Sequence, residues 1–340
     1  MKNILVTGGA GYIGSHTAVD LIESGYSVVI ADALFNASPE IVARIAQITG
    51  TSVPLEQVDL ADSAAVDALF SKYHFDGVIH FAAHKSVGDS VEQPLEYYRN
   101  NLDSLVYLLQ AMVAYEVPCF IFSSSCSVYG NAEHIPVTEL TPLQPAESPY
   151  AATKQMGERI VRDAVRAYPQ LQAVLLRYFN PAGAHPSNLI GESPRNRANN
   201  LVPIICEVAT GKRESMTVFG DEYDTRDGSC IRDYIHVCDL ARAHTLCLHY
   251  LEAHRNESAC ETFNVGIGEG VTVLEAIAAF ESVTGRSLDY TVGPTREGDV
   301  VAIYADYTRA AERLGWQPRY DIADIMRTAY DWASGPHSTF

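Results

Sequence analysis

Residues 6–16 read VTGGAGYIGSH and join an apolar run to an amphipathic one. Gly8, Gly11 and Gly14 stand in GxxGxxG spacing, and the same stretch also contains GxGxxG. Glycines at these intervals allow a tight turn and a close approach of the backbone to a pyrophosphate at a helix N-terminus. Asp32 ends the next apolar run, where a carboxylate can bind an adenosine ribose hydroxyl and repel a 2′-phosphate. The pattern predicts a dinucleotide site that prefers NAD to NADP.

Apolar runs and amphipathic stretches alternate on both sides of this loop. The predicted strands are 3–7, 27–32, 53–59, 77–82, 119–125 and 173–179, and the predicted helices are 12–24, 38–48, 62–73, 94–115 and 149–167. Apolar strands that alternate with helices indicate a parallel sheet covered on both faces. The predicted fold class is therefore α/β, a doubly wound parallel (Rossmann) sheet with a smaller mixed α/β C-terminal domain.

The alternation of predicted strands and helices ends at about residue 180, beyond which Pro, Gly and Asn are frequent. We expect an NAD-binding Rossmann domain over 1–180 and a second domain over 181–340, and the family resemblance described below implies that this second domain binds a nucleotide sugar. Part of 233–270 could return to the first domain.

Composition narrows the classes of function. The 340 residues are 47% hydrophobic and 19% charged, which suits a folded core, and the net charge of -18 argues against nucleic acid or an anionic membrane as partner. Seven scattered cysteines without a CxxC pair predict free thiols in the cytoplasm and no metal site. No run reaches the roughly 20 apolar residues of a membrane helix, and the N-terminus has no signal-peptide pattern.

The motif SPYAATK, residues 148–154, predicts catalytic chemistry at a helix start. Ser148 suits an N-cap and Pro149 the first helical turn. Tyr150 and Lys154 are one turn apart and share a face. Because a phenol is a weak base near neutral pH, a neighbouring ammonium that lowers its pKa would make it useful.

Further motifs extend the pattern along nearly the whole chain. They are HFAAHKSVGDS (80–90), PLEYYRNN (94–101), FIFSSSCSVYG (120–130), LLRYFNPAGAHPS (175–187), RDYIHVCDLA (232–241) and REGD (296–299). In order and spacing they resemble the extended short-chain dehydrogenase/reductases, and among these the UDP-glucose 4-epimerase family. The resemblance implies NAD as cofactor, a UDP-sugar substrate and a homodimer, in which helices 94–115 and 149–167 form a four-helix bundle.

The resemblance implies a role for each matching residue. Tyr150 is the acid/base, Lys154 tunes it and holds the nicotinamide ribose, and Ser125 hydrogen-bonds the sugar 4-oxygen. The other cofactor residues are Gly8, Gly11, Tyr12, Ile13, Gly14, Asp32, Asn36, Asp59, Leu60, Phe81, Lys85, Asn100 and Tyr178. The other substrate residues are Lys85, Asn180, Asn200, Leu201, Thr217, Phe219, Arg232, Arg296, Asp299 and Ile303. Arginine suits the diphosphate because its guanidinium forms a bidentate fork.

The implied reaction is reversible C4 epimerisation of UDP-glucose and UDP-galactose. A Tyr150 phenolate takes the proton of the sugar 4-OH while hydride leaves C4, giving a 4-keto sugar and NADH. The keto sugar turns over, and the hydride returns to its other face. Ile303 borders the hexose 2-substituent, and a residue smaller than tyrosine there leaves room for an acetamido group.

Other readings of the motifs are weaker, and one stays open. A 4,6-dehydratase needs an acid pair where Cys126 and Ser127 stand, and a GDP-sugar epimerase-reductase needs a cysteine at 127. A non-catalytic dinucleotide sensor would be expected to lack Tyr150 or Lys154. A UDP-N-acetylhexosamine or UDP-uronic acid as main substrate remains an alternative.

The sequence also departs from the family pattern at three places. Ala33 stands where asparagine is frequent, His84 stands where an apolar residue is expected, and the run 191–199 is unusual. We expect His84 to pack within its loop.

Overall fold

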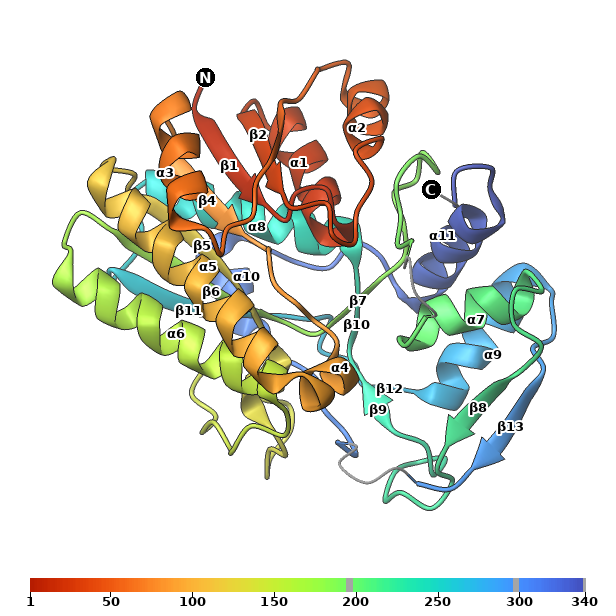
Figure 1. The fold of residues 1–340 in the computed structure, drawn as a ribbon. Coiled ribbons are helices and arrows are strands. Elements are labelled where there is room, and N and C mark those ends of the chain that lie inside the picture. Colours follow the sequence, from red (N-terminus) through yellow and green to blue (C-terminus); the bar gives the residue numbers. More distant parts are fainter. Residues whose placement is uncertain (194–197, 296–299, 339–340) are drawn as a thin grey trace.

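The computed structural model describes residues 1–193, 198–295 and 300–338. A sheet of seven parallel strands forms its centre, in the order β11-β6-β5-β4-β1-β2-β3 (Figure 1). The strands are β1 (Asn3–Thr7), β2 (Ser27–Asp32), β3 (Leu55–Gln57), β4 (Gly77–His80), β5 (Cys119–Ser125), β6 (Gln172–Tyr178) and β11 (Cys260–Val265). This sheet confirms the predicted doubly wound fold.

Helices cover both faces of the sheet. The helices α3 (Ser63–Lys72), α5 (Pro94–Ala114) and α6 (Pro149–Ala167) pack on one face with a shared apolar core. The helices α1 (Tyr12–Glu23), α2 (Ile41–Thr49) and α8 (Val237–Glu252) pack on the other face. The short helix α4 (Val87–Glu92) lies next to α5 and α6 at the carboxyl edge of the sheet (Figure 1).

Two elements of the second half join this sheet. The strand β11 pairs with β6, and α8 packs against α1. The run that forms β11 was not among the six predicted strands, and the predicted strands 53–59 and 77–82 end earlier, at Gln57 and His80.

The remaining elements form a smaller group beside the carboxyl edge of the sheet (Figure 1). Its helices are α7 (Leu201–Ala209), α9 (Val273–Thr284) and α11 (Ile322–Ser334). The helix α10 (Thr308–Leu314) instead packs on α8 and β11, beside the large sheet. The short strand pairs of the smaller group are β8 (Met216–Phe219) with β13 (Tyr290–Gly293), β7 (Asn180–Ala182) with β10 (Tyr234–His236), and β9 (Ile231–Arg232) with β12 (Val271–Thr272). The helices α7, α9 and α11 share their own apolar core. Among the described helices, none has the length and apolarity that crossing a bilayer requires.

Candidate active site

The glycine loop leaves the backbone bare where β1 passes into α1. Gly8 has φ +66°, and a Cβ atom there would lie 2.7 Å from the backbone nitrogen of Ala82. A Cβ atom on Gly14 would lie 2.4 Å from the carbonyl oxygen of Gly8. Because Gly11 is the N-cap residue and has no side chain, the first amide groups of α1 stay uncovered. This bare helix N-terminus fits the pyrophosphate of a dinucleotide.

Asp32 hydrogen-bonds two loops, the glycine loop and the loop after β2, which lie on either side of the predicted ribose site. Its Oδ2 atom accepts the amide hydrogen of Ala10 at 3.1 Å, and its Oδ1 atom accepts that of Leu34 at 2.8 Å. Burial raises the pKa of Asp32, while these two bonds lower it. Of the other predicted adenosine residues, Asn36 and Asp59 are exposed and Leu60 is buried. Asp32 therefore holds two loops together, and its predicted contact with the ribose would be a second role.

Tyr150 and Lys154 lie on the first two turns of α6. This helix begins as predicted, with Pro149 in its first turn and the Ser148 Oγ atom accepting the Ala151 amide hydrogen at 3.2 Å. Ser125 ends β5, and its side chain lies close enough to Tyr150 to lower the pKa of the phenol. The structure therefore brings together the three predicted catalytic side chains at the carboxyl edge of the sheet.

In the protein without a cofactor, the pKa of Tyr150 is raised, whereas the sequence predicted that the neighbouring Lys154 ammonium would lower it. Burial raises the pKa of Tyr150 well above its ordinary value, and the Ser125 side chain opposes this only in part. The ammonium of Lys154 donates to the Ser123 carbonyl oxygen at 2.7 Å and lies 5.9 Å from the Tyr150 ring centre. Burial lowers the pKa of Lys154 to about 8. Tyr150 is therefore neutral near pH 7, and its ionisation needs additional positive charge.

Several of the other predicted cofactor residues make contacts within the protein. Tyr178 ends β6, is buried, and hydrogen-bonds the Ser123 hydroxyl. Tyr12 donates from its hydroxyl to the Gly183 carbonyl oxygen at 2.6 Å, and the Phe81 ring lies 4.6 Å from that of His244. Asn100 donates to Asn101, which also binds the backbone of His84.

His84 packs between two aromatic rings. Its ring lies 5.6 Å from that of Phe35 and 5.4 Å from that of Tyr97. Burial lowers the pKa of His84. These contacts are those of a side chain that joins the loops after β2 and β4 to α5.

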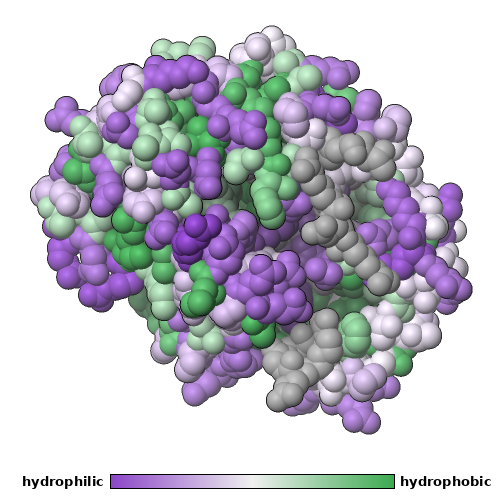
Figure 2. Space-filling view, viewed as in Figure 1, coloured by the Kyte–Doolittle hydropathy of each residue, from purple (hydrophilic) through white to green (hydrophobic). Residues whose placement is uncertain are grey.

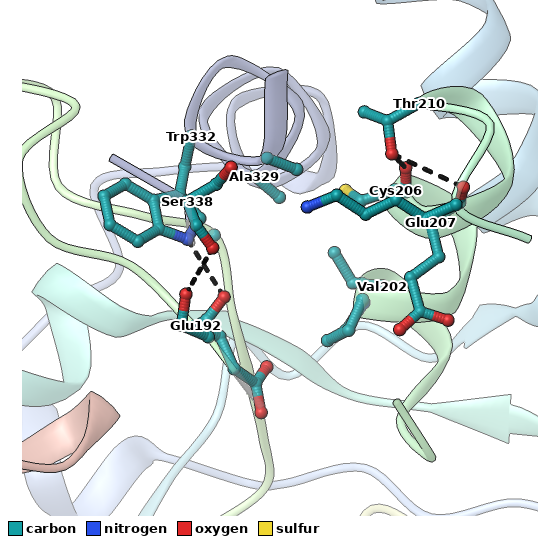
Figure 3. A pocket seen from close by; sticks show the side chains of 13 residues that line it. Glu192, Val202, Cys206, Glu207, Thr210, Ala329, Trp332 and Ser338 are labelled. Atoms are coloured by element: carbon teal, nitrogen blue, oxygen red, sulfur yellow. Dashed lines mark hydrogen bonds between the residues drawn. The ribbon is translucent and has the colours of Figure 1, made fainter. Parts of the chain in front are cut away.

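Glu192 connects residues of both predicted binding sets, and the sequence did not single it out. Its Oε1 atom lies 3.3 Å from the Lys85 ammonium and 3.5 Å from the Asn200 Nδ2 atom. The indole nitrogen of Trp332 donates to the Glu192 backbone carbonyl at 2.9 Å. Glu192 borders the cavity of Figure 3, which lies between α7 and α11 and is lined by none of the predicted catalytic residues. An acidic residue after a loop glycine gave no specific signal in the sequence.

The predicted substrate residues lie on short elements beyond the sheet. Asn180 begins β7, and its buried Oδ1 atom has no hydrogen-bond partner among the described residues. Arg232 ends β9 and donates to the Val300 carbonyl oxygen at 2.6 Å. Thr217 and Phe219 are exposed on β8, and Leu201 begins α7. Arg296 and Asp299 lie outside the described residues.

Ile303 is buried, with 5% of its surface exposed, beside η1 (Cys126–Tyr129). It belongs to a small apolar cluster with Val128, Tyr129 and Phe179, against which Cys126 packs. Burial raises the pKa of the Cys126 thiol to about 12, so this residue carries no acid function near neutral pH.

The comparisons with known proteins cover almost the whole chain. The family model described as GDP-mannose 4,6 dehydratase matches residues 5–329. The UDP-glucose 4-epimerase of Mus musculus is 45% identical over 346 residues, which covers 100% of this chain and 99% of that protein.

Two solved structures are similar throughout. The UDP-glucose 4-epimerase of Stenotrophomonas maltophila, with bound NAD and formylated UDP-arabinopyranose, has a TM-score of 0.94 and 44% identity, and covers 98% of each chain. That of Bifidobacterium longum, in complex with NAD+ and UDP, has a TM-score of 0.94 and 42% identity, and covers 99% of this chain and 100% of the other. With the motifs, the fold and these likenesses in agreement, the chain belongs to the UDP-glucose 4-epimerase family of extended short-chain dehydrogenase/reductases.

Proposed function

We propose that this chain catalyses the reversible C4 epimerisation of UDP-glucose and UDP-galactose with NAD as a retained cofactor. The observation that carries the proposal is the convergence of Ser125, Tyr150 and Lys154 at the sheet edge that also holds the bare glycine loop. The likeness to epimerases crystallised with NAD and UDP-sugars supports it.

The residues present fit the dinucleotide. The uncovered N-terminus of α1 would receive its pyrophosphate, Asp32 its adenosine ribose and Lys154 its nicotinamide ribose. When bound, NAD+ would accept a hydride from sugar C4 and return it. Its positive charge would also supply what Tyr150 lacks for ionisation.

The protein side chains would handle the proton of the sugar. Tyr150 takes the proton from the 4-hydroxyl group and later returns it, and Ser125 holds the 4-oxygen within reach. Asn180 offers a buried, unsatisfied acceptor, which suits a substrate hydroxyl or amide hydrogen. Arg232 would hold the diphosphate, together with Arg296 of the REGD motif.

The side chains that follow Ser125 favour epimerisation over dehydration. A dehydratase must move protons at C5 and C6, and a carboxylic acid pair does this work. Cys126 is a buried thiol with a raised pKa, and Ser127 is a hydroxyl group. Neither can replace an acid near neutral pH.

The test is the conversion of purified UDP-galactose. We expect UDP-glucose to form without added NAD, because every cycle would regenerate NAD+ within the protein. Formation of a stable 4-keto-6-deoxy product would instead identify a dehydratase.

N-acetylated UDP-hexoses are a second class of substrate that Ile303 favours. Its side chain lies in the apolar cluster beside η1, next to the strand end that carries Ser125. Isoleucine occupies less space than tyrosine and has no hydroxyl group. We propose slow turnover of UDP-N-acetylglucosamine beside the main reaction.

A homodimer through α5 and α6 is the assembly we propose. These helices pack side by side, and Figure 2 shows apolar patches among hydrophilic surface on this side of the molecule. Leu95 is 82% exposed on α5 and Met156 is 45% exposed on α6. Pairing across a two-fold axis would cover both side chains in a four-helix bundle. Sedimentation at the mass of two chains is the expected result.

Two further expectations stay proposals. All seven cysteines are free, which supports a reducing, cytoplasmic location. A domain division near residue 180, with α8 and β11 returning to the Rossmann domain, agrees with the way these two elements pack.

A further inference from the structure

A buried ion pair joins α6, the helix that carries Tyr150 and Lys154, to the strand β6. Glu158, one turn beyond Lys154 on α6, is 2% exposed, and Arg177 on β6 is 3% exposed. The Arg177 Nε atom donates to Glu158 Oε1 at 2.7 Å, and its Nη2 atom donates to Oε2 at 2.6 Å. Neither residue belongs to the predicted catalytic or binding sets. The pair therefore needs an explanation of its own.

The pair is the centre of a hydrogen-bond network that joins five elements, α6, β6, β5, η1 and β11. Ser124 on β5 donates to Glu158 Oε1 at 2.7 Å. On the other side, Arg177 donates to the Tyr129 hydroxyl at 3.0 Å, and Tyr129 donates to Asn264 on β11 at 2.6 Å. Because buried charges are costly unless fully paired, this network tolerates little movement of α6 against the sheet.

The same network is joined to the catalytic side chains through three consecutive serines. Ser123 accepts from Lys154 through its backbone carbonyl, Ser124 donates to Glu158, and Ser125 contacts Tyr150. Three successive residues of β5 thus each contact a different residue of α6. Displacement of Glu158 would therefore move the proton-transfer group relative to the end of β5.

Glu158 also supplies negative charge near Lys154. The titratable groups that face Lys154 are Tyr150 and Glu158 on its own helix and His80 on β4, and Tyr178 on β6 interacts with Tyr150. Burial raises the pKa of both tyrosines and lowers that of His80 to about 3, so these three are neutral near pH 7. Glu158 is the anionic group of this set.

We propose that Glu158, held by Arg177, is a positioning residue for the reaction: it fixes α6 against β5 and supplies the negative charge beside the Lys154 ammonium. This inference rests on the proposed function, because it assigns Glu158 through its effect on Lys154 and Tyr150. The proposed effect of the pair on Lys154 and Tyr150 is separate from any contribution of the pair to folding stability.

The test uses the holoenzyme and three variants. Glu158→Gln removes the charge, Glu158→Asp keeps it on a shorter side chain, and the double variant Glu158→Gln/Arg177→Met removes both charges. The double variant secures a folded protein, since replacing both partners of a buried pair is often neutral while removing one is strongly destabilising. Asp163→Asn is the matched control, because Asp163 pairs with Arg159 on the exposed side of the same helix.

The midpoint of Lys154 titration is read in two ways. One is the pH at which UDP-galactose turnover declines on the alkaline side. The other is the side-chain signal of isotope-labelled lysine in nuclear magnetic resonance, assigned with Lys154→Arg, which needs no turnover. We expect Glu158→Gln to lower the midpoint by about one pH unit. The double variant should lower it less, because it removes the Arg177 cation together with the Glu158 anion. Glu158→Asp and Asp163→Asn should leave it near that of the unmodified protein.

The outcomes separate this inference from the proposed function. If the lysine signal titrates at the same pH in all variants, Glu158 is a folding residue alone and the inference is wrong. An equal loss of turnover in Glu158→Gln and Glu158→Asp with no shift of midpoint has the same meaning. If the signal shifts as expected but the unmodified protein never converts UDP-galactose, the proposed function fails and the electrostatic assignment stands.

Discussion

Replacing Tyr150 by phenylalanine should separate catalysis from folding. The change removes one hydroxyl group and leaves the ring, which is partly buried on the first turn of α6. In the proposed reaction this hydroxyl group is the acid and the base for the sugar 4-oxygen. The variant should therefore fold and bind NAD, yet convert UDP-galactose very slowly.

The size of each effect follows from the contacts of the hydroxyl group. The group with which it interacts is the Ser125 side chain, and the loss of even a full hydrogen bond costs only about 1 kcal/mol of folding free energy. Loss of a general acid/base slows a reaction by about 10²–10⁴-fold, which corresponds to roughly 3–5 kcal/mol of activation free energy. The loss of activity should thus exceed the loss of stability several-fold.

The assay follows UDP-galactose turnover and denaturant unfolding in parallel. Tyr168→Phe is the control, because Tyr168 ends the same helix and is 44% exposed. This control should match the unmodified protein in both measurements. Near-normal turnover in Tyr150→Phe would remove Tyr150 from the mechanism.

Three further predictions concern the charge of Lys154, the cofactor and the substrate range. Turnover should decline as the pH rises through about 8, because burial lowers the pKa of Lys154 to that value and its ammonium is lost above it; a pH–rate profile that stays flat to pH 10 would contradict this. Asp32→Ala should weaken the preference for NAD over NADP in cofactor-binding titrations, and an unchanged preference would mean that Asp32 only braces its two loops. Ile303→Tyr should suppress turnover of UDP-N-acetylglucosamine and spare that of UDP-glucose. A clash of that kind costs about 1–3 kcal/mol, or roughly 5- to 150-fold. Equal loss of both activities would assign Ile303 to the apolar cluster alone.

The local patterns of the first half were sufficient to predict most of the sheet. The strands 3–7, 27–32 and 119–125 and the helix 149–167 have the predicted bounds, because an apolar run or a cap residue marks each end. The strand β11 was missed because its run, CETFNV, alternates polar and apolar residues in a part of the chain without a repeating rhythm. Its place beside β6 depends on a long-range pairing that no local pattern encodes.

The catalytic side chains were predictable from the sequence, but the residues that hold them in position were not predicted. Tyr150 and Lys154 stand at helical spacing within one motif. Glu158 continues the same spacing, and Arg177 interrupts an apolar strand, so both gave signals that were overlooked. Glu192 gave none, since its contact with Lys85 joins segments far apart in the chain. The neutral state of Tyr150 depends on burial, which spacing alone does not reveal.

The most direct test of the account is one incubation of purified protein with UDP-galactose and no added dinucleotide. We expect an equilibrium mixture of UDP-galactose and UDP-glucose, and release of NAD from the same preparation on denaturation. No UDP-glucose from a folded preparation that has been supplied with NAD would contradict the proposed reaction. Turnover that rises in proportion to added NAD, from protein that releases none, would contradict the retained cofactor.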